Sequence, residues 1–218
     1  MPTVKLFFAP GACSLAPHIL LQSSGLDFTP VRIDYKGIDV QFPEEFRKVN
    51  PKMKVPVLIV DDETITELPA ICTFISHLAP DKHLMGQTPL ENVRILEWLN
   101  FLSGTVHSTG YGLFFRPWRW TTSDDKEVIA GIKEKSRQAL LEHFDYIESR
   151  LSKQPEFAVG DGFTAVDPLL YVMYRWANST GFDLGLYSAY SKLVERLERI
   201  ESVQIVLNKE RLPFVNGS

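Results

Sequence analysis

Hydrophobic and polar positions change their spacing part-way along the chain. Short apolar runs bounded by turn residues predict buried strands over 4–8, 28–34, 57–60 and 64–66. Helical spacing between and after these runs predicts helices over 15–22, 42–49 and 69–78. Strands that alternate with helices in this order are typical of a small α/β unit, with a hairpin near its end.

The second part of the chain is helical in pattern almost throughout. A polar, turn-rich stretch from Pro80 to Pro89 precedes it, and the apolar positions then recur at helical spacing. Helices are predicted around 95–102, 128–151, 165–176 and 193–200. We therefore predict an α/β domain over 1–79, a linker over 80–88 and an all-helical domain over 89–218.

Composition narrows the function classes. The 218 residues are 44% hydrophobic with a net charge of −4, which excludes a disordered chain and disfavours a dedicated nucleic-acid partner. No apolar run approaches the roughly 20 residues of a membrane span, and the N-terminus lacks signal-peptide anatomy. Cys13 and Cys72 have no metal-ligand spacing, so we expect no metal site and a reducing, cytoplasmic compartment.

The first candidate for chemistry is Cys13, between a predicted strand and a predicted helix. Free backbone N–H groups and the helix dipole favour an anion at such a position, which can lower the pKa of a thiol. Ser14 is a candidate for the side-chain cap of the helix. The alternative is that Cys13 is a small buried hydrophobic residue, as free cysteines usually are.

Two later segments offer backbone and charge for a ligand. A cis peptide bond before Pro56 would turn the backbone edge of Val55 toward an extended ligand, although a trans proline that begins a strand is commoner. Glu67 stands just before a helix start, where it could bind an ammonium group while nearby N–H groups bind a carboxylate. A plain acidic residue at a helix N-terminus is the alternative.

Together these segments resemble a known family. The residues that carry the resemblance are Pro10-Gly11-Ala12-Cys13-Ser14-Leu15, Asn50-Pro51-Lys52, Val55-Pro56, Thr66-Glu67 and Ala70-Ile71. In this order and spacing they resemble the N-terminal domain of the glutathione transferases, most closely the bacterial beta class. The resemblance covers essentially the whole chain. It implies a thioredoxin-like α/β domain followed by an all-α helical bundle, a homodimer, and glutathione as co-substrate.

The resemblance also implies roles for individual residues. Cys13 would contact the glutathione sulfur and could form a mixed disulfide with it. The backbone of Val55 would pair with the cysteinyl part of glutathione beside a cis Pro56. Glu67 would lie near the γ-glutamyl group, and His107 would face the thiol as a hydrogen-bond partner or proton acceptor.

Three further positions complete the implied glutathione site, and some positions depart from the family pattern. Lys36, Lys54 and Leu68 are the further predicted contacts, with Lys36 near the glycyl carboxylate. Leu68 stands where the family usually has Ser, Thr or Gly, so a hydroxyl contact is lost and a lower glutathione affinity follows. Phe8 replaces a tyrosine common among relatives, and Ser108 replaces a lysine common in the beta class.

The segment from Tyr111 to Trp120 is unusually aromatic. It could pack where a long helix ends, line a pocket for an apolar second substrate, or stack on nucleic-acid bases. Two arginines in a negatively charged chain disfavour the last option. We expect a mixture of the first two, with Tyr111 and Phe115 as pocket candidates. Later in the chain, Thr164 to Asp167 forms the pattern of a capping box, with a role in folding.

Three functions are therefore open. The leading expectation is an enzyme that conjugates the glutathione thiolate to a hydrophobic electrophile, as in detoxification. The second keeps the fold but uses Cys13 covalently, as a thiol oxidoreductase, dehalogenase or double-bond isomerase. The third is a non-catalytic ligand-binding protein of the same fold, which the unusual Leu68 keeps open.

Overall fold

A four-stranded mixed sheet forms the first part of the molecule. The structure, a computed structural model, describes residues 2–36, 39–154 and 156–215. The strands are β1 (Val4–Phe8), β2 (Thr29–Arg32), β5 (Val57–Val60) and β6 (Glu63–Thr66), in the order β2-β1-β5-β6. β1 runs parallel to β2 and antiparallel to β5, and β6 is antiparallel to β5. A short hairpin pairs β3 (Tyr35–Lys36) with β4 (Asp39–Val40).

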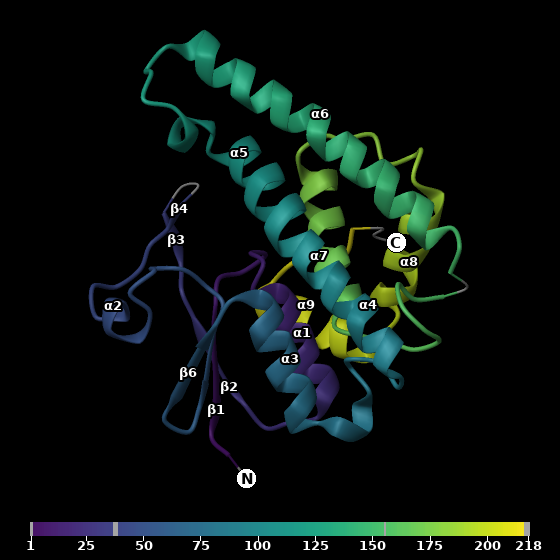
Figure 1. The fold of residues 1–218 in the computed structure, drawn as a ribbon. Helices are drawn as coiled ribbons and strands as arrows, with labels where there is room; N and C mark the ends of the chain where they lie inside the picture. Colours follow the sequence, from purple (N-terminus) through teal and green to yellow (C-terminus); the bar gives the residue numbers. More distant parts are fainter. Residues whose placement is uncertain (1, 37–38, 155, 216–218) are drawn as a thin grey trace.

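Helices cover the two faces of this sheet unequally. α1 (Leu15–Ser24) and α3 (Leu68–Leu78) lie on the face toward the helical domain, and the short α2 (Phe46–Val49) lies on the opposite side (Figure 1). Successive residues of a strand point to opposite faces. Leu6 accordingly enters the main core, whereas Phe7 packs against the small cluster around α2.

The rest of the chain is helical. Its elements are η1 (Pro80–Lys82), α4 (Pro89–Asn100), η2 (Phe101–Tyr111, a π-helix), α5 (Gly112–Phe115), η3 (Pro117–Trp120), α6 (Lys126–Leu151), α7 (Val166–Ser179), α8 (Ser188–Glu198) and α9 (Glu201–Glu210). α7 is buried along most of its length and packs against α1, α4 and α8, while α9 returns to α1 (Figure 1). The two parts therefore share one hydrophobic core.

The pattern predicted most elements but not all of their limits. Strands 4–8 and 57–60 have the predicted bounds, whereas the helix predicted over 42–49 is confined to its last turn. The β3–β4 hairpin was not predicted. The helix predicted over 193–200 lies largely in α8, and Ile200 adopts an extended conformation, so the chain turns there into a separate helix, α9. No helix among the described residues is long and apolar enough to cross a membrane.

The predicted capping box at the start of α7 forms only in part. The carboxylate of Asp167 reaches back to accept the backbone N–H of Thr164 at 2.7 Å and its hydroxyl at 3.1 Å. It also accepts the N–H of Ala158 at 3.0 Å, which ties the preceding loop to the helix. The Thr164 hydroxyl meets Val166 N–H at 3.4 Å rather than Asp167 N–H. Burial raises the pKa of Asp167 to about 6, against the opposing effect of these hydrogen bonds.

We expect Asp167→Ala to lower the free energy of unfolding by about 2–4 kcal/mol, because three buried donors lose their acceptor. Urea unfolding followed by circular dichroism measures the change. Asp161→Ala, an exposed carboxylate in the same loop, is the matched control and should change stability by no more than about 0.5 kcal/mol. Equal effects of the two substitutions would contradict a stabilising role for the hydrogen bonds that Asp167 accepts.

The raised pKa of Asp167 also makes the stability of the fold depend on pH. Because the pKa of Asp167 is raised in the folded state, its protonated form is favoured by folding, and this contribution is lost as the pH rises from about 4 through 6. The stability difference between wild type and Asp167→Asn should therefore shift by about 3 kcal/mol between pH 4 and 7. The same stability difference between wild type and Asp167→Asn at both pH values would contradict the raised pKa of Asp167.

Candidate active site

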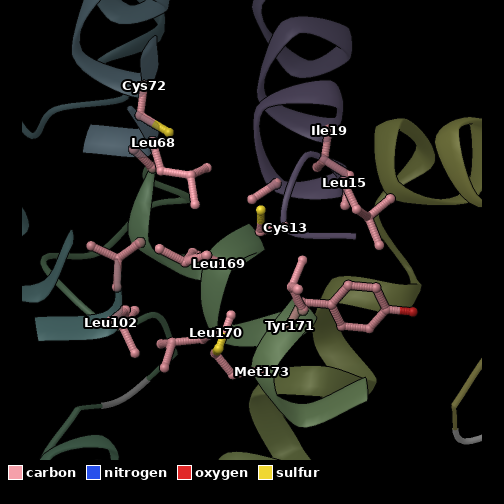
Figure 2. Packing of buried hydrophobic residues seen from close by; sticks show 14 of the residues in the cluster. Cys13, Leu15, Ile19, Leu68, Cys72, Leu102, Leu169, Leu170, Tyr171 and Met173 are labelled. Carbon is pink, nitrogen blue, oxygen red and sulfur yellow. The ribbon is translucent and has the colours of Figure 1, made fainter. Parts of the chain in front are cut away.

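Cys13 lies in the turn between β1 and α1, where chain segments from both parts of the molecule meet. The turn is closed by the N–H of Ala12, which donates to the carbonyl of Ala9 at 3.0 Å. The Cys13 side chain is only 8% exposed, and its Sγ donates to the carbonyl of Val55 at 3.6 Å. Figure 2 shows it among buried side chains of α1, α3 and α7. The thiol is therefore largely shielded from solvent.

The pKa of this thiol is raised, not lowered as its position at a helix start predicts. Burial raises the pKa of Cys13 to about 12, although the N–H groups of Cys13 and Ser14 and the charge of Lys54 act in the opposite direction. Desolvation therefore outweighs the helix N-terminus. The predicted side-chain cap is also wrong, because the Ser14 hydroxyl turns back to the N–H and carbonyl of Ala9, each at 3.1 Å.

A buried asparagine shapes the loop that faces Cys13. The side-chain amide of Asn50 donates to the carbonyl of Lys54 at 2.8 Å, and its oxygen accepts the N–H of Lys52 at 3.1 Å. The loop then enters β5 through a cis Val55–Pro56 peptide bond, which confirms the conformation implied by the resemblance. This arrangement places the Val55 carbonyl beside the Cys13 sulfur.

Glu67 stands at the start of α3 in the left-handed region, with φ of +71°. Its exposed carboxylate forms an ion pair with Lys52, whose ammonium group also donates to the Thr66 hydroxyl at 2.7 Å. Sequence reasoning did not select Lys52, although it lies within the Asn50-Pro51-Lys52 segment. Leu68 begins α3 and buries its side chain in the main core, so only its backbone is left for a ligand.

His107 lies in the π-helix η2, with its ring 5.2 Å from the ring of Trp176. Burial, assisted by the charges of Lys54 and Arg116, lowers the pKa of His107 to about 4. The imidazole is therefore neutral near pH 7, where it can donate one hydrogen bond but is a weak proton acceptor. The charge of Lys54 acts on Cys13 as well as on His107, so the exposed Lys54 lies within electrostatic range of both.

Of the two pocket candidates, Tyr111 is excluded from an open pocket. Its side chain is fully buried, and its hydroxyl donates to the carbonyl of Met173 at 2.7 Å, so it packs η2 against α7. Phe115 is only partly buried and stacks on Tyr111 at 5.4 Å, which leaves one part of its ring accessible. The backbone of Lys36 lies in β3, and its side chain is outside the described residues.

Comparison with known proteins agrees with this geometry. The glutathione S-transferase N-terminal and C-terminal domain families match residues 11–78 and 130–199. The chain is 33% identical to glutathione S-transferase GstA of Escherichia coli O157:H7 over 96% of its own length and all of that protein. It belongs to the glutathione S-transferase family. Among the described residues of this transferase, no group of three or more His, Cys, Asp or Glu could hold a metal ion.

Solved structures place this glutathione transferase near the beta class. A beta-class enzyme from Sphingomonas chungbukensis is 34% identical, with a TM-score of 0.80 over 95% of this chain and 99% of that one. A sphingomonad glutathione S-transferase complexed with glutathione is 33% identical, with the same TM-score and the same shares of the two chains. The thioredoxin-like fold followed by a helical domain is therefore confirmed, and the chain is an enzyme most like the beta class.

We expect Cys13 to react slowly with iodoacetamide and to show no reactivity plateau below pH 9, because burial holds its pKa near 12. The rate should instead rise steadily with pH. Mass spectrometry of the tryptic peptide that contains Cys13 measures it. Cys72, which is fully buried with a similarly raised pKa, is the internal reference. A plateau near neutral pH at Cys13 would show a thiolate and contradict the assignment.

Proposed function

We propose that this enzyme joins the thiolate of glutathione to an electrophilic carbon of a hydrophobic second substrate. The observation that carries the proposal is the position of Lys54, whose charge acts on both Cys13 and His107. A positive charge within electrostatic range of a thiol and a neutral imidazole favours an anionic sulfur held near them. His107 can donate a hydrogen bond to that sulfur, and Cys13 can do so when its S–H turns from the Val55 carbonyl.

The chemical step follows from this arrangement. With a chloro-nitroaromatic substrate, the glutathione sulfur forms a bond to the ring carbon, and chloride leaves with the electrons of the broken bond. The thiol proton is released to solvent when the thiolate forms. Cys13 keeps its own proton throughout, since its pKa is near 12, and His107 stays neutral. Holding both substrates together supplies much of the remaining acceleration.

The remaining glutathione contacts are assigned to the segments around Cys13. The backbone of Val55 beside the cis Pro56 offers an extended edge for the cysteinyl part of glutathione. The Glu67 carboxylate suits the γ-glutamyl ammonium group, and the Leu68 N–H at the start of α3 suits a carboxylate. Lys36 is assigned to the glycyl carboxylate. Because Leu68 has no hydroxyl, one contact fewer is made, and the affinity for glutathione is lower.

An apolar second substrate would bind beside the aromatic side chains of the helical domain. Phe115 lies 5.7 Å from Trp176, and Trp176 lies 5.2 Å from His107, so this aromatic series leads from Phe115 to the catalytic imidazole. Aromatic walls favour flat, apolar electrophiles, which is consistent with a role in detoxification. Both cysteines are free, as is usual in the cytoplasm, the compartment we assign.

A covalent role for Cys13 is the second candidate. In an oxidoreductase or an isomerase of this fold, Cys13 would attack a sulfur or a carbon as a thiolate. Its closeness to the predicted glutathione sulfur favours such a role, but a pKa near 12 disfavours it. The non-catalytic alternative rests on Leu68 alone.

The experiment compares wild type, Cys13→Ser and Lys54→Gln in turnover of a chloro-dinitroaromatic with glutathione. We expect Cys13→Ser to stay within about tenfold of wild type, because a hydroxyl also donates a hydrogen bond. We expect Lys54→Gln to raise the apparent pKa of the kcat/KM profile, because a positive charge no longer stabilises the thiolate.

Intact mass after incubation with oxidised glutathione separates the alternatives. The expected result is an adduct that forms slowly, because Cys13 is mostly protonated, and that Cys13→Ser lacks, with turnover retained by that variant. Turnover abolished in Cys13→Ser would favour the covalent chemistry. Neither adduct nor turnover in the folded wild-type protein would contradict the proposal and leave ligand binding as the better explanation.

We also assign a homodimer, formed through the outer faces of α3 and α4. Leu90 and Val93 on α4 are 66% and 58% exposed, which is unusual for large apolar side chains. They lie on the same helix as Leu96, which lines a shallow groove together with Pro69, Ala70, Thr73, Phe74 and His77 of α3. Sedimentation equilibrium at micromolar concentration should give twice the mass of the chain, and Val93→Glu should lower it. A single-chain mass for the wild type would contradict the assignment.

A further inference from the structure

The loop that carries Cys13 is held by two side chains of the helical domain. Both bind Gly11, which lies two residues before Cys13. The Gly11 N–H donates to Oε2 of Glu210, in α9, at 2.9 Å. The Gly11 carbonyl accepts Nε1–H of Trp176, in α7, at 2.8 Å. The two peptide groups that flank the Gly11 Cα are therefore both bound from the other half of the molecule.

Glu210 is itself fixed in place. Its second carboxylate oxygen lies 2.7 Å from Nδ1 of His18, in α1, and both side chains are fully buried. One carboxylate thus joins the turn before α1, the first half of α1 and the last residue of α9. A buried carboxylate with this many partners has one defined position, because each lost hydrogen bond would leave a buried polar group unpaired.

Trp176 connects the same turn to the catalytic histidine. Its ring lies 5.2 Å from His107 and 5.1 Å from Tyr111, while its N–H reaches Gly11. Leu212, which follows α9, closes the third side of the turn: a Cβ at Gly11 would meet its Cδ2 at 3.4 Å. Gly11 also has φ of +68°, so a side chain there would be strained as well as crowded.

We propose that Trp176 and Glu210, the Gly11 anchor, are positioning residues that hold the Cys13 thiol closed against the Val55 carbonyl. The turn is held on either side by the Ala12 N–H, which donates to the Ala9 carbonyl, and the Leu15 N–H, which donates to the Ala12 carbonyl. A shift of Gly11 would therefore move the Cys13 backbone, and with it the sulfur, relative to the Val55 carbonyl. The helical domain therefore sets how accessible the thiol is. The effect of the Gly11 anchor on catalysis rests on the function proposed above, whereas its effect on the position of the thiol does not.

The test is the rate at which iodoacetamide alkylates Cys13 in Trp176→Phe, measured on the tryptic peptide. This variant keeps an aromatic ring but loses the N–H donor, and we expect the rate to rise about tenfold, as for loss of one hydrogen bond. Trp98→Phe is the matched control, because Trp98 is buried and its indole N–H has no partner among the described residues. Cys72 in the same digest reports general loosening of the fold.

Glu210 supplies a second pair of variants. Glu210→Gln retains an acceptor for the Gly11 N–H and should keep the wild-type rate within about threefold, whereas Glu210→Ala should raise it about tenfold. Unchanged Cys13 rates in both Trp176→Phe and Glu210→Ala would overturn the proposal. Equal acceleration at Cys13 and Cys72, or equal acceleration in Trp98→Phe, would overturn it too, because the effect would then be global.

Retention of the wild-type protein on immobilised glutathione separates the two proposals. If the wild type is not retained, the proposed function fails, yet the alkylation rates still report on the Gly11 anchor. If it is retained and the variants leave the Cys13 rate unchanged, the anchor fails and the proposed function stands. In retained variants with faster alkylation, we expect the KM for glutathione to rise more than kcat falls, since the anchor acts on the position of the site.

Discussion

Burial of the Cys13 thiol at the junction of the two halves determines the chemistry open to this transferase. A thiol that is 8% exposed and donates a hydrogen bond to a carbonyl stays protonated, and burial also keeps His107 neutral. Neither group is then a strong nucleophile or base. Both are hydrogen-bond donors, and the charge of Lys54 acts on both. Two neutral donors and a nearby positive charge are what the function proposed above requires of these residues.

The same burial requires that the α/β and helical parts pack as one body. Their side chains form a single core, in which α7 and α9 lie against α1. Polar links cross this contact at the turn before Cys13, where Glu210 and Trp176 bind the two peptide groups around Gly11. Buried polar groups fix one geometry more sharply than apolar contacts do, since a shifted partner leaves an unpaired donor or acceptor. The site is thus shaped by residues far apart in the sequence.

The sequence pattern predicted the limits of an element best where the alternation of side chains along the chain is regular. The runs over 4–8 and 57–60 became strands with the predicted bounds because alternate residues face two cores. The resemblance implied the cis Pro56, although a trans proline is commoner at the start of a strand. Two predictions were wrong. The Ser14 hydroxyl binds Ala9 in the preceding turn instead of capping the helix. The Tyr111 hydroxyl donates to the carbonyl of Met173 in α7, which buries the side chain that was predicted to line a pocket. Trp176 ends the helix predicted over 165–176, and helical spacing alone does not predict its contact with Gly11.

The sequence by itself determined the family, most of the order of strands and helices, and the candidates Cys13 and His107, because these depend on local periodicity and on motif order. Only the tertiary structure decided their protonation states. A pKa depends on how much water and which charges surround a group, and the burial of Cys13 and the approach of Lys54 arise from contacts between distant segments. The same holds for Glu210, whose partners His18 and Gly11 come from the other end of the chain.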